Sequence, residues 1–257
     1  MKNNFLNKPV ANIYFKPSHN SEVVSQILYG EKFKILLKRK KYIKIKTHYD
    51  NYIGYIKKGK FLENFKPSYK ISKIKSRIFF KRDKRFLSSN HYLYYGSGVC
   101  KRNENKKYIE FEKNKWIKKS DIKNIDHHEK NYIKIFKFFL NTKYLWGGKT
   151  CVGIDCSALI QIYFYYNRIF FPRDSKDQIK FCKKKNTKEF LKLKKKIIFW
   201  KGHVAISIDK KNLIHAYGPK KRVIIMNTEK TISTILKDAF LKPIFLNNSK
   251  KWIKIFK

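Results

Sequence analysis

Long apolar runs are missing from this sequence. No window approaches the roughly eighteen consecutive apolar residues that a membrane-spanning helix requires. Residues 1–14 contain no apolar stretch long enough for the central region of a secretory signal peptide. These absences argue against a membrane-embedded or exported chain, and we expect a cytoplasmic protein.

Acidic residues are scarce, with 18 Asp and Glu against 62 Lys and Arg and a formal net charge of +44. Such a charge is typical of proteins that bind nucleic acid or another polyanion. The lysines, however, are spread through every segment and accompany many Ile, Asn, Phe and Tyr residues, whose codons are rich in A and T. No basic tail or arginine-rich arm is present. We interpret the charge as a solvated surface rather than a specific nucleic-acid site, although it can favour acidic substrates.

Cysteine is also sparse. The four cysteines, at positions 100, 151, 156 and 182, lack CxxC spacing and do not resemble a disulfide framework or a metal site. We therefore expect reduced thiols and neither a metal nor a cofactor. With 42% hydrophobic residues among 257, the chain can bury a core and is long enough for several domains.

The first half of the chain consists of short segments that favour β structure. Apolar residues alternate or cluster over residues 33–37, 42–46 and 52–56, with turn-like stretches between them. Short strands at this spacing predict a small barrel.

An internal repeat follows the same order as these segments. Three motifs recur: Tyr29-Gly30 as Tyr95-Gly96, Lys40–Ile43 as Lys106–Ile109, and Tyr55–Lys58 as Trp116–Lys119. Two sequential modules are therefore predicted, over residues 1–65 and 66–124. Their layout resembles the bacterial SH3-like barrel, a module that commonly binds cell-wall material or peptides.

The pattern changes near residue 125, where apolar residues adopt helical spacing over 131–140. We expect a third domain over residues 125–257. Its most informative segment, residues 143–160, is rich in glycine and then abruptly helical. Cys156 lies where that helix should begin. Unpaired backbone N–H groups and the helix dipole there favour a thiolate and can receive an oxyanion.

A thiol nucleophile needs a base, and the base needs an orienting partner. His203 follows a tight turn at Lys201-Gly202 and begins a strand, and His215 lies on the next strand. Adjacent strands are about 4.8 Å apart, so one imidazole can orient the other. The remaining histidines lie in turn-like or charged stretches and are expected at the surface.

Five motifs in this domain together resemble the NlpC/P60 cysteine peptidases, most closely the branch related to dipeptidyl-peptidase VI. They are Tyr144-x-Trp146-Gly147-Gly148, Asp155-Cys156-Ser157, Pro172-Arg173-Asp174-Ser175, Gly202–Ile206 and Ile214-His215-Ala216. The resemblance implies an α+β fold overall: a circularly permuted papain-like catalytic domain preceded by two small all-β SH3-like barrels.

The resemblance also implies roles for individual residues. Cys156 would attack the γ-D-glutamyl to diamino-acid amide of a peptidoglycan stem peptide, with His203 as general base and His215 as its orienter. Tyr144 would help to form the oxyanion site, while Asp155 and Ser157 match positions that contact the free α-amine of the peptide. Arg173 and Asp174 could bind a substrate carboxylate or cap the next helix, and the cap is slightly favoured.

The sequence leaves several functions open. The main hypothesis is a peptidase that trims free muropeptides, whose preference for a free N-terminus comes from the SH3-like modules. An exported D,L-endopeptidase that cuts intact wall is a second hypothesis, and a basic wall- or nucleic-acid-binding protein with a vestigial catalytic domain is a third. An acyltransferase would use the same thioester. The expected partners are peptidoglycan-derived peptides rather than a specific nucleic acid or a membrane, and the oligomeric state is open.

Overall fold

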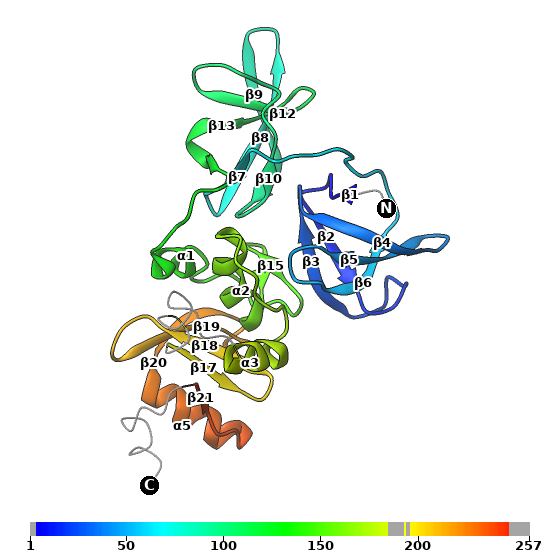
Figure 1. The fold of residues 1–257 in the computed structure, drawn as a ribbon. Coiled ribbons are helices and arrows are strands. Elements are labelled where there is room, and N and C mark those ends of the chain that lie inside the picture. Colours follow the sequence, from blue (N-terminus) through cyan, green and yellow to red (C-terminus); the bar gives the residue numbers. More distant parts are fainter. Residues whose placement is uncertain (1–3, 185–192, 194–195, 247–257) are drawn as a thin grey trace.

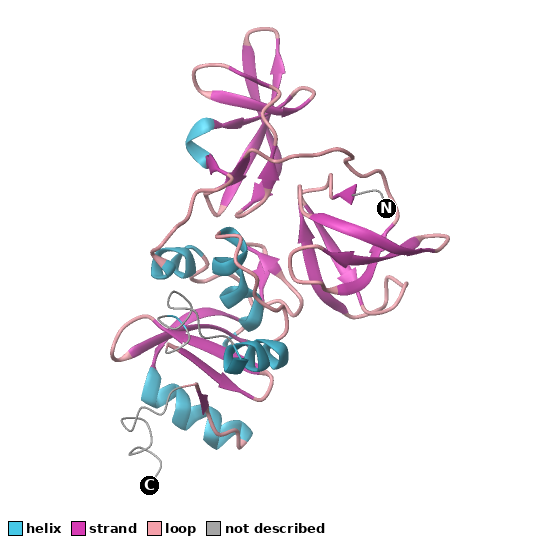
Figure 2. Ribbon diagram, in the orientation of Figure 1, coloured by secondary structure: helices cyan, strands magenta, loops and turns pink. Residues whose placement is uncertain are grey.

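The computed structural model describes residues 4–184, 193 and 196–246. The chain forms two β modules followed by an α+β domain (Figures 1 and 2). The C-terminal eleven residues, 247–257, belong to the predicted third domain but lie outside the described residues. Among the helices that are described, none is long and apolar enough to cross a membrane.

The first module is a curved six-stranded antiparallel sheet. Its strands are β1 (Asn4–Phe5), β2 (Val10–Tyr14), β3 (Val23–Leu28), β4 (Lys32–Lys38), β5 (Tyr42–Thr47) and β6 (Ile53–Lys57), in the order β1-β4-β5-β6-β2-β3. Alternate apolar residues, including Ile13, Ile27, Phe33 and Ile45, are buried in one core. The alternating lysines face outward, as the sequence pattern predicts.

The second module is also all-β. It contains β7 (Tyr69–Ile71), β8 (Lys75–Arg82), β9 (Arg85–Tyr94), β10 (Gly98–Val99), β11 (Asn103–Glu104), β12 (Tyr108–Glu112), β13 (Lys115–Lys118), the 3-10 helix η1 (Lys119–Asp121) and β14 (Ile122–Asn124). These strands form a five-stranded sheet, β11-β12-β13-β8-β9, and a three-stranded sheet, β10-β7-β14.

The sequence repeat falls on corresponding places in the two modules. Gly30 and Gly96 both have a positive φ, +74° and +84°, and each sits in a tight turn after a tyrosine. The other two motifs lie at β5 and β12 and at β6 and β13. Glycine is favoured at both turns because it alone adopts this backbone conformation at no steric cost.

The C-terminal domain packs helices on both faces of a five-stranded antiparallel sheet. Its elements are α1 (Tyr132–Phe138), β15 (Lys149–Thr150), β16 (Gly153–Ile154), α2 (Cys156–Tyr166), α3 (Ser175–Lys184), β17 (Ile197–Trp200), β18 (His203–Ser207), β19 (Asn212–Tyr217), η2 (Gly218–Lys220), β20 (Arg222–Asn227), α5 (Thr228–Ala239) and β21 (Ile244–Phe245). The order in the sheet is β20-β19-β18-β17-β21.

The central strands of this sheet are apolar on both sides because both faces are covered. Phe199 and Val204 face the core that contains α2, whereas Ile198 and Ala205 face the core that contains α5. Helix α2 is almost fully buried along its length. The sheet and α2 thus form a rigid support for the residues at the beginning of the helix.

Candidate active site

The Cys156 side chain occupies the first turn of α2, as predicted. Asp155 is the N-cap, with its carboxylate accepting a 2.8 Å hydrogen bond from the Ala158 amide. Such a cap satisfies one of the unpaired N–H groups at a helix start and fixes where the helix begins. The thiol is buried, 4% of the residue being exposed, and its Sγ lies 4.0 Å from the Gly202 carbonyl oxygen. The β17–β18 turn that carries His203 therefore lies directly against the nucleophile.

The helix start favours a thiolate, but its effect on the pKa of Cys156 is outweighed. Burial, followed by the nearby Asp155 charge, raises the pKa of Cys156 to about 12. The Val204 and Ser157 amides and the Arg173 charge act in the opposite direction but do not compensate. The resting thiol is therefore protonated, and it needs a base to become a nucleophile.

The two predicted histidines lie next to each other on adjacent strands. His203 begins β18 after Gly202, whose φ of +76° allows the tight turn from β17. His203 Nε2 lies 2.9 Å from His215 Nδ1 on β19. Burial lowers the pKa of His203 to about 4, and burial together with the His203 charge lowers the pKa of His215 to about 3. Both rings are therefore neutral at neutral pH.

Met226 on β20 indicates which nitrogen of each imidazole carries the proton. Its Sδ lies 3.3 Å from His215 Nε2, and a thioether can only accept a hydrogen bond. His215 therefore carries its proton on Nε2 and accepts on Nδ1 from His203 Nε2–H. His203 is left with an unprotonated Nδ1, which is the form that a general base requires. No motif pointed to Met226, since a methionine on a strand normally fills a core.

Tyr144 lies close to the nucleophile. Its backbone pairs with Ile154, so it is held beside the strand that leads into Asp155 and Cys156. Burial, followed by the Cys156 and Asp155 charges, raises the pKa of Tyr144. Its hydroxyl stays protonated and can donate a hydrogen bond to a developing oxyanion.

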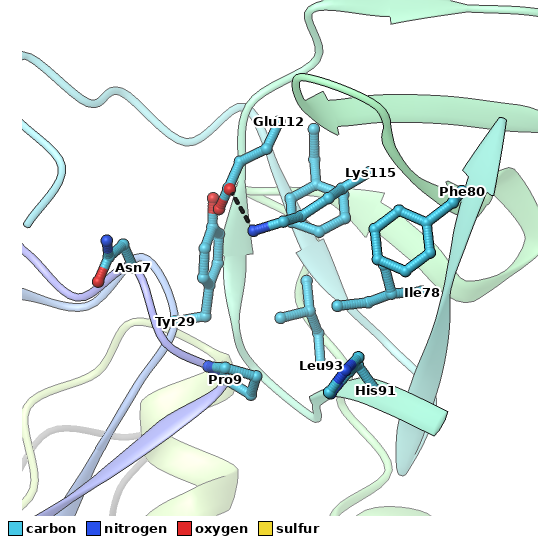
Figure 3. A pocket seen from close by; sticks show the side chains of 10 residues that line it. Asn7, Pro9, Tyr29, Ile78, Phe80, His91, Leu93, Glu112 and Lys115 are labelled. Carbon is cyan, nitrogen blue, oxygen red and sulfur yellow. Dashed lines mark hydrogen bonds and ion pairs between the residues drawn. The ribbon is translucent and has the colours of Figure 1, made fainter. Parts of the chain in front are cut away.

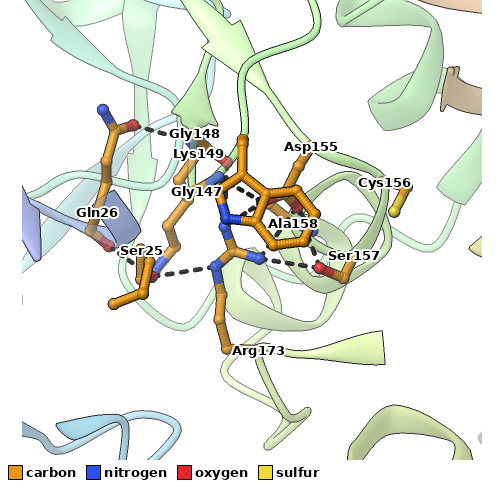
Figure 4. Close-up of polar contacts among 12 residues, drawn as sticks. Ser25, Gln26, Gly147, Gly148, Lys149, Asp155, Cys156, Ser157, Ala158 and Arg173 are labelled. Carbon is orange, nitrogen blue, oxygen red and sulfur yellow. Dashed lines mark hydrogen bonds and ion pairs between the residues drawn. The ribbon is translucent and has the colours of Figure 1, made fainter. Parts of the chain in front are cut away.

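Asp155 and Ser157 form a buried cluster with Arg173 (Figure 4). Arg173 Nη2 lies 2.6 Å from Asp155 Oδ2, while Nη1 donates to Asp155 Oδ1 at 3.0 Å and to the Ser157 hydroxyl at 2.9 Å. The Asp155 carboxylate also accepts from the Gly147 amide at 2.9 Å. A substrate ammonium would meet a carboxylate that is already neutralised, so the contact between these two residues and a free α-amine stays a prediction.

Asp174 lies at the N-cap position of α3, as the slightly favoured alternative predicts, whereas the expectation for Arg173 needs correction. Arg173 is 2% exposed and paired with Asp155, so it neither caps α3 nor reaches solvent to bind a carboxylate. For Asp174, the backbone oxygen accepts from the Asp177 and Gln178 amides, and the carboxylate faces the Tyr52 hydroxyl at 3.3 Å. Pairing of Arg173 with an acidic N-cap cannot be read from their separation in sequence.

The first module contacts the nucleophile loop through side chains that sequence reasoning missed. From β3, Ser25 Oγ accepts from Arg173 Nε at 3.0 Å, and Gln26 Oε1 accepts from the Lys149 amide at 2.8 Å (Figure 4). Glu31 pairs with the Lys149 ammonium at 3.3 Å, with both side chains at most 3% exposed. The β3 edge therefore supports the loop that carries Asp155.

One acidic residue of the first module lies at the surface of the same loop. Glu22 Oε1 accepts a 2.6 Å hydrogen bond from the Trp146 indole N–H. Trp146 is 57% exposed, and Leu145 and Val152 in the same loop are also exposed. An acidic and an apolar surface thus meet beside the nucleophile loop.

The other histidines lie apart from this cluster. His19, His48, His91 and His128 are exposed and His127 is half-buried beside Tyr166. Burial is the first cause that lowers the pKa values of His48 and His127.

A buried cysteine at a helix start, packed against the turn that precedes two paired histidines on adjacent antiparallel strands, has the groups that nucleophilic catalysis by a thiol requires. Residues 141–239 match the NlpC/P60 family, and residues 13–60 match the bacterial dipeptidyl-peptidase Sh3 domain. These two regions are therefore similar to an NlpC/P60 domain, whose family comprises cysteine peptidases and hydrolases, and to a dipeptidyl-peptidase SH3 domain. The SH3-like identity of the second module stays a prediction.

Similar proteins were found by sequence and by structure. Dipeptidyl-peptidase 6 of Lysinibacillus sphaericus is 31% identical over 86 residues, which span 34% of this chain and 31% of that relative. An NlpC/P60 family protein from Bacillus cereus ATCC 10987 has a TM-score of 0.72 at 17% identity, covering 95% of this chain and 100% of the other. An NlpC/P60 endopeptidase from Photobacterium damselae subsp. piscicida has a TM-score of 0.61 at 12% identity, covering 95% and 71%. At these identities the two structures show a shared fold.

Proposed function

We propose that this protein is a cysteine peptidase that hydrolyses the γ-D-glutamyl to diamino-acid bond of peptidoglycan stem peptides, preferring free peptides with a free N-terminus. The observation that carries the proposal is the buried Cys156 thiol against the Gly202 turn, directly followed by His203 and its contact with His215. The Dipeptidyl-peptidase 6 relative supports the choice of a peptide substrate.

The geometry supports the following sequence of steps. His203 Nδ1 takes the thiol proton as Cys156 Sγ bonds to the amide carbonyl carbon. The Tyr144 hydroxyl and the backbone amides at the start of α2 stabilise the oxyanion. The C–N bond then breaks, and the His203 imidazolium returns its proton to the departing amine. His203 next activates a water molecule, which hydrolyses the thioester to a carboxylate and restores the thiol.

The preference for a free N-terminus is proposed from the position of the first module. Glu22 places a carboxylate beside the exposed Trp146 of the nucleophile loop. A carboxylate at this surface can pair with a peptide ammonium, whereas the Asp155 carboxylate is already held by Arg173. A stem peptide attached to a polymeric wall strand through its N-terminus has no free N-terminal α-ammonium to offer.

Hydrolysis of L-Ala-γ-D-Glu-diaminopimelate, compared between the wild-type chain and Cys156→Ala, tests this function. The variant should lose about 10⁴-fold or more in kcat because it removes the proposed nucleophile. Cys182→Ala is the matched control, since that thiol is also buried but lies in α3. Full hydrolysis by Cys156→Ala, or faster release of peptide from whole sacculi than from the free tripeptide, would contradict the proposal.

A further inference from the structure

A cavity of about 230 Å³ lies between the first and second modules, away from the thiol and the imidazoles (Figure 3). Asn7 and Tyr29 enter it from the first module, and Glu112 and Lys115 enter it from β12 and β13 of the second. Its remaining walls are mostly apolar and include Ile78, Leu93 and Phe111. A mostly apolar cavity with a few convergent polar groups is the common form of a small-molecule site.

The polar atoms that converge on this cavity have few partners. Asn7 Oδ1 is buried without a hydrogen bond to any described residue. Tyr29 is 1% exposed, and its hydroxyl faces the Glu112 carboxylate, with which it interacts (Figure 3). A buried acceptor without a partner is rare in folded proteins, and Asn7 Oδ1 beside an under-paired phenol and carboxylate calls for an occupant.

The chemistry of these atoms selects the kind of occupant. Glu112 Oε1 and Asn7 Oδ1 are acceptors, and a phenol oxygen can also accept. The second Glu112 oxygen, Oε2, is already bound by the Lys115 ammonium at 2.6 Å. The Tyr29 O–H faces this carboxylate and can donate one hydrogen bond to it. The lone pairs left on Asn7 Oδ1, the phenol oxygen and Glu112 Oε1 therefore require hydrogen-bond donors, and the carboxylate favours a positively charged donor group.

The size of the cavity limits the apolar part of the occupant. A protein cavity of about 150 Å³ accommodates benzene. The 230 Å³ available here therefore suits a molecule slightly larger than benzene. The buried side chains of Ile78, Leu93 and Phe111 would contact a branched or aromatic hydrocarbon group.

We propose that this cavity binds a small primary amine with a compact apolar body. The ammonium donates to Glu112 Oε1 and Asn7 Oδ1 and lies against the Tyr29 hydroxyl, and the hydrocarbon body lies against Ile78, Leu93 and Phe111. Because these contacts come from both modules, the bound amine links the first module to the second. The site is independent of the proposed peptidase activity, so Cys156→Ala should bind the amine with unchanged affinity.

Calorimetric titration of the full chain with isoamylamine tests the proposal, with isoamyl alcohol and isovalerate as probes of similar shape. The amine should bind, the alcohol should bind at least tenfold more weakly, and the carboxylate should not bind. Glu112→Gln should weaken amine binding at least tenfold. Glu104→Gln is the matched control, since Glu104 belongs to the same module and pairs with Lys101 at 2.6 Å on the exposed surface.

Tyr29→Phe provides a second test that does not depend on a charge change. It removes a hydroxyl that interacts only with the part-exposed Glu112 carboxylate, so the thermal midpoint of unfolding should stay within about 2 °C of wild type while amine binding weakens. Absence of amine binding in the wild-type chain would overturn the proposal. Equal binding by wild type, Glu112→Gln and Tyr29→Phe would overturn it as well, as would a crystal structure grown with the amine in which only ordered water fills the cavity.

Discussion

The Cys156 thiol and the two imidazoles share one electrostatic condition: burial favours the uncharged form of each. It raises the pKa of the thiol and lowers the pKa values of His203 and His215. A neutral thiol beside a neutral imidazole is a different resting state from a thiolate–imidazolium pair. In this state the proton moves only when the substrate carbonyl is in place to accept the thiol sulfur.

The pH dependence of hydrolysis should reveal the lowered pKa of His203. An ordinary histidine, with a pKa of 6.5, loses about 90% of its base form by pH 5.5. Burial lowers the pKa of His203 to about 4, so most of this histidine is still in its base form at pH 5.5. We expect kcat/KM for the free tripeptide to stay level between about pH 5 and 8 and to fall below about pH 4.5. An acid limb centred near 6.5 would contradict this expectation.

Stability must be followed over the same range, because the same pKa values govern it. Both histidines have folded pKa values below 6.5, so the unfolded chain binds their protons more readily. Their contribution to the free energy of unfolding is fully present above pH 6.5 and is lost as pH falls through about 4. Urea unfolding at each pH separates this loss of fold from a true loss of the base.

The buried ion pair between Arg173 and Asp155 also supports the site. Both side chains are buried, and the pair holds the helix N-cap in place. Arg173→Met leaves the Asp155 charge buried and unpaired, which should lower the free energy of unfolding by about 3–5 kcal/mol. Urea denaturation measures this, with Arg168→Met as the control because Arg168 forms an exposed pair with Asp126.

The double variant Arg173→Met/Asp155→Asn tests the cause of that loss. If the cost comes from the unpaired charge, adding Asp155→Asn should restore part of the stability, and the two changes should be strongly non-additive. An additive result would show that Arg173 acts through packing alone.

The elements that carry the site were predictable where local rules determine them. Residues 197–200 and 203–207 form two strands around Gly202, and the helix after Asp155 begins at Cys156, where the sequence places its start. Hydrophobic spacing, a glycine turn and an acidic N-cap are all readable from neighbouring residues.

The elements that come together from distant parts of the chain were not predictable in this way. The β3 edge reaches the nucleophile loop through Ser25 and Gln26, and Met226 contacts His215 from the adjacent strand. Such contacts depend on how modules dock and on the register of β19 against β20. Neither a local propensity nor a single motif contains that information. The pKa of the thiol was not predictable for a related reason, because the burial that raises it was not visible in the motif.

Gly147 tests the contact between the β3 edge and the nucleophile loop. Its φ is +72°, and an added Cβ would lie 2.3 Å from the Val23 carbonyl oxygen. Gly147→Ala should therefore move the loop from β3, weaken the hydrogen bond to Asp155, and lower the free energy of unfolding by about 1–3 kcal/mol. We expect kcat/KM to fall with it. Gly59→Ala is the matched control because nothing lies within 4 Å of its added Cβ; equal effects of the two variants would exclude a role for the contact.

At the scale of the whole molecule, the docking of the first module places charged groups at two depths. The buried Glu31–Lys149 pair ties the module to the C-terminal domain, whereas Glu22 remains at the surface beside Trp146. The buried pair can act on stability, and the exposed carboxylate is available to a ligand. The overall charge of +44 makes such an exposed carboxylate a local exception.

The surface carboxylate gives a specificity prediction for the assembled chain. Glu22→Gln should raise KM about tenfold for a tripeptide with a free α-amine, because a hydrogen bond to a charged group is lost. It should leave KM for the N-acetylated tripeptide unchanged and kcat nearly unchanged for both. Steady-state kinetics with the two peptides measures the difference, and Glu229→Gln, on the exposed first turn of α5, makes the same change in net charge. An equal rise in KM for both peptides would mean that Glu22 orders Trp146 rather than meeting the amine, and the preference for free peptides would then have to arise within the C-terminal domain.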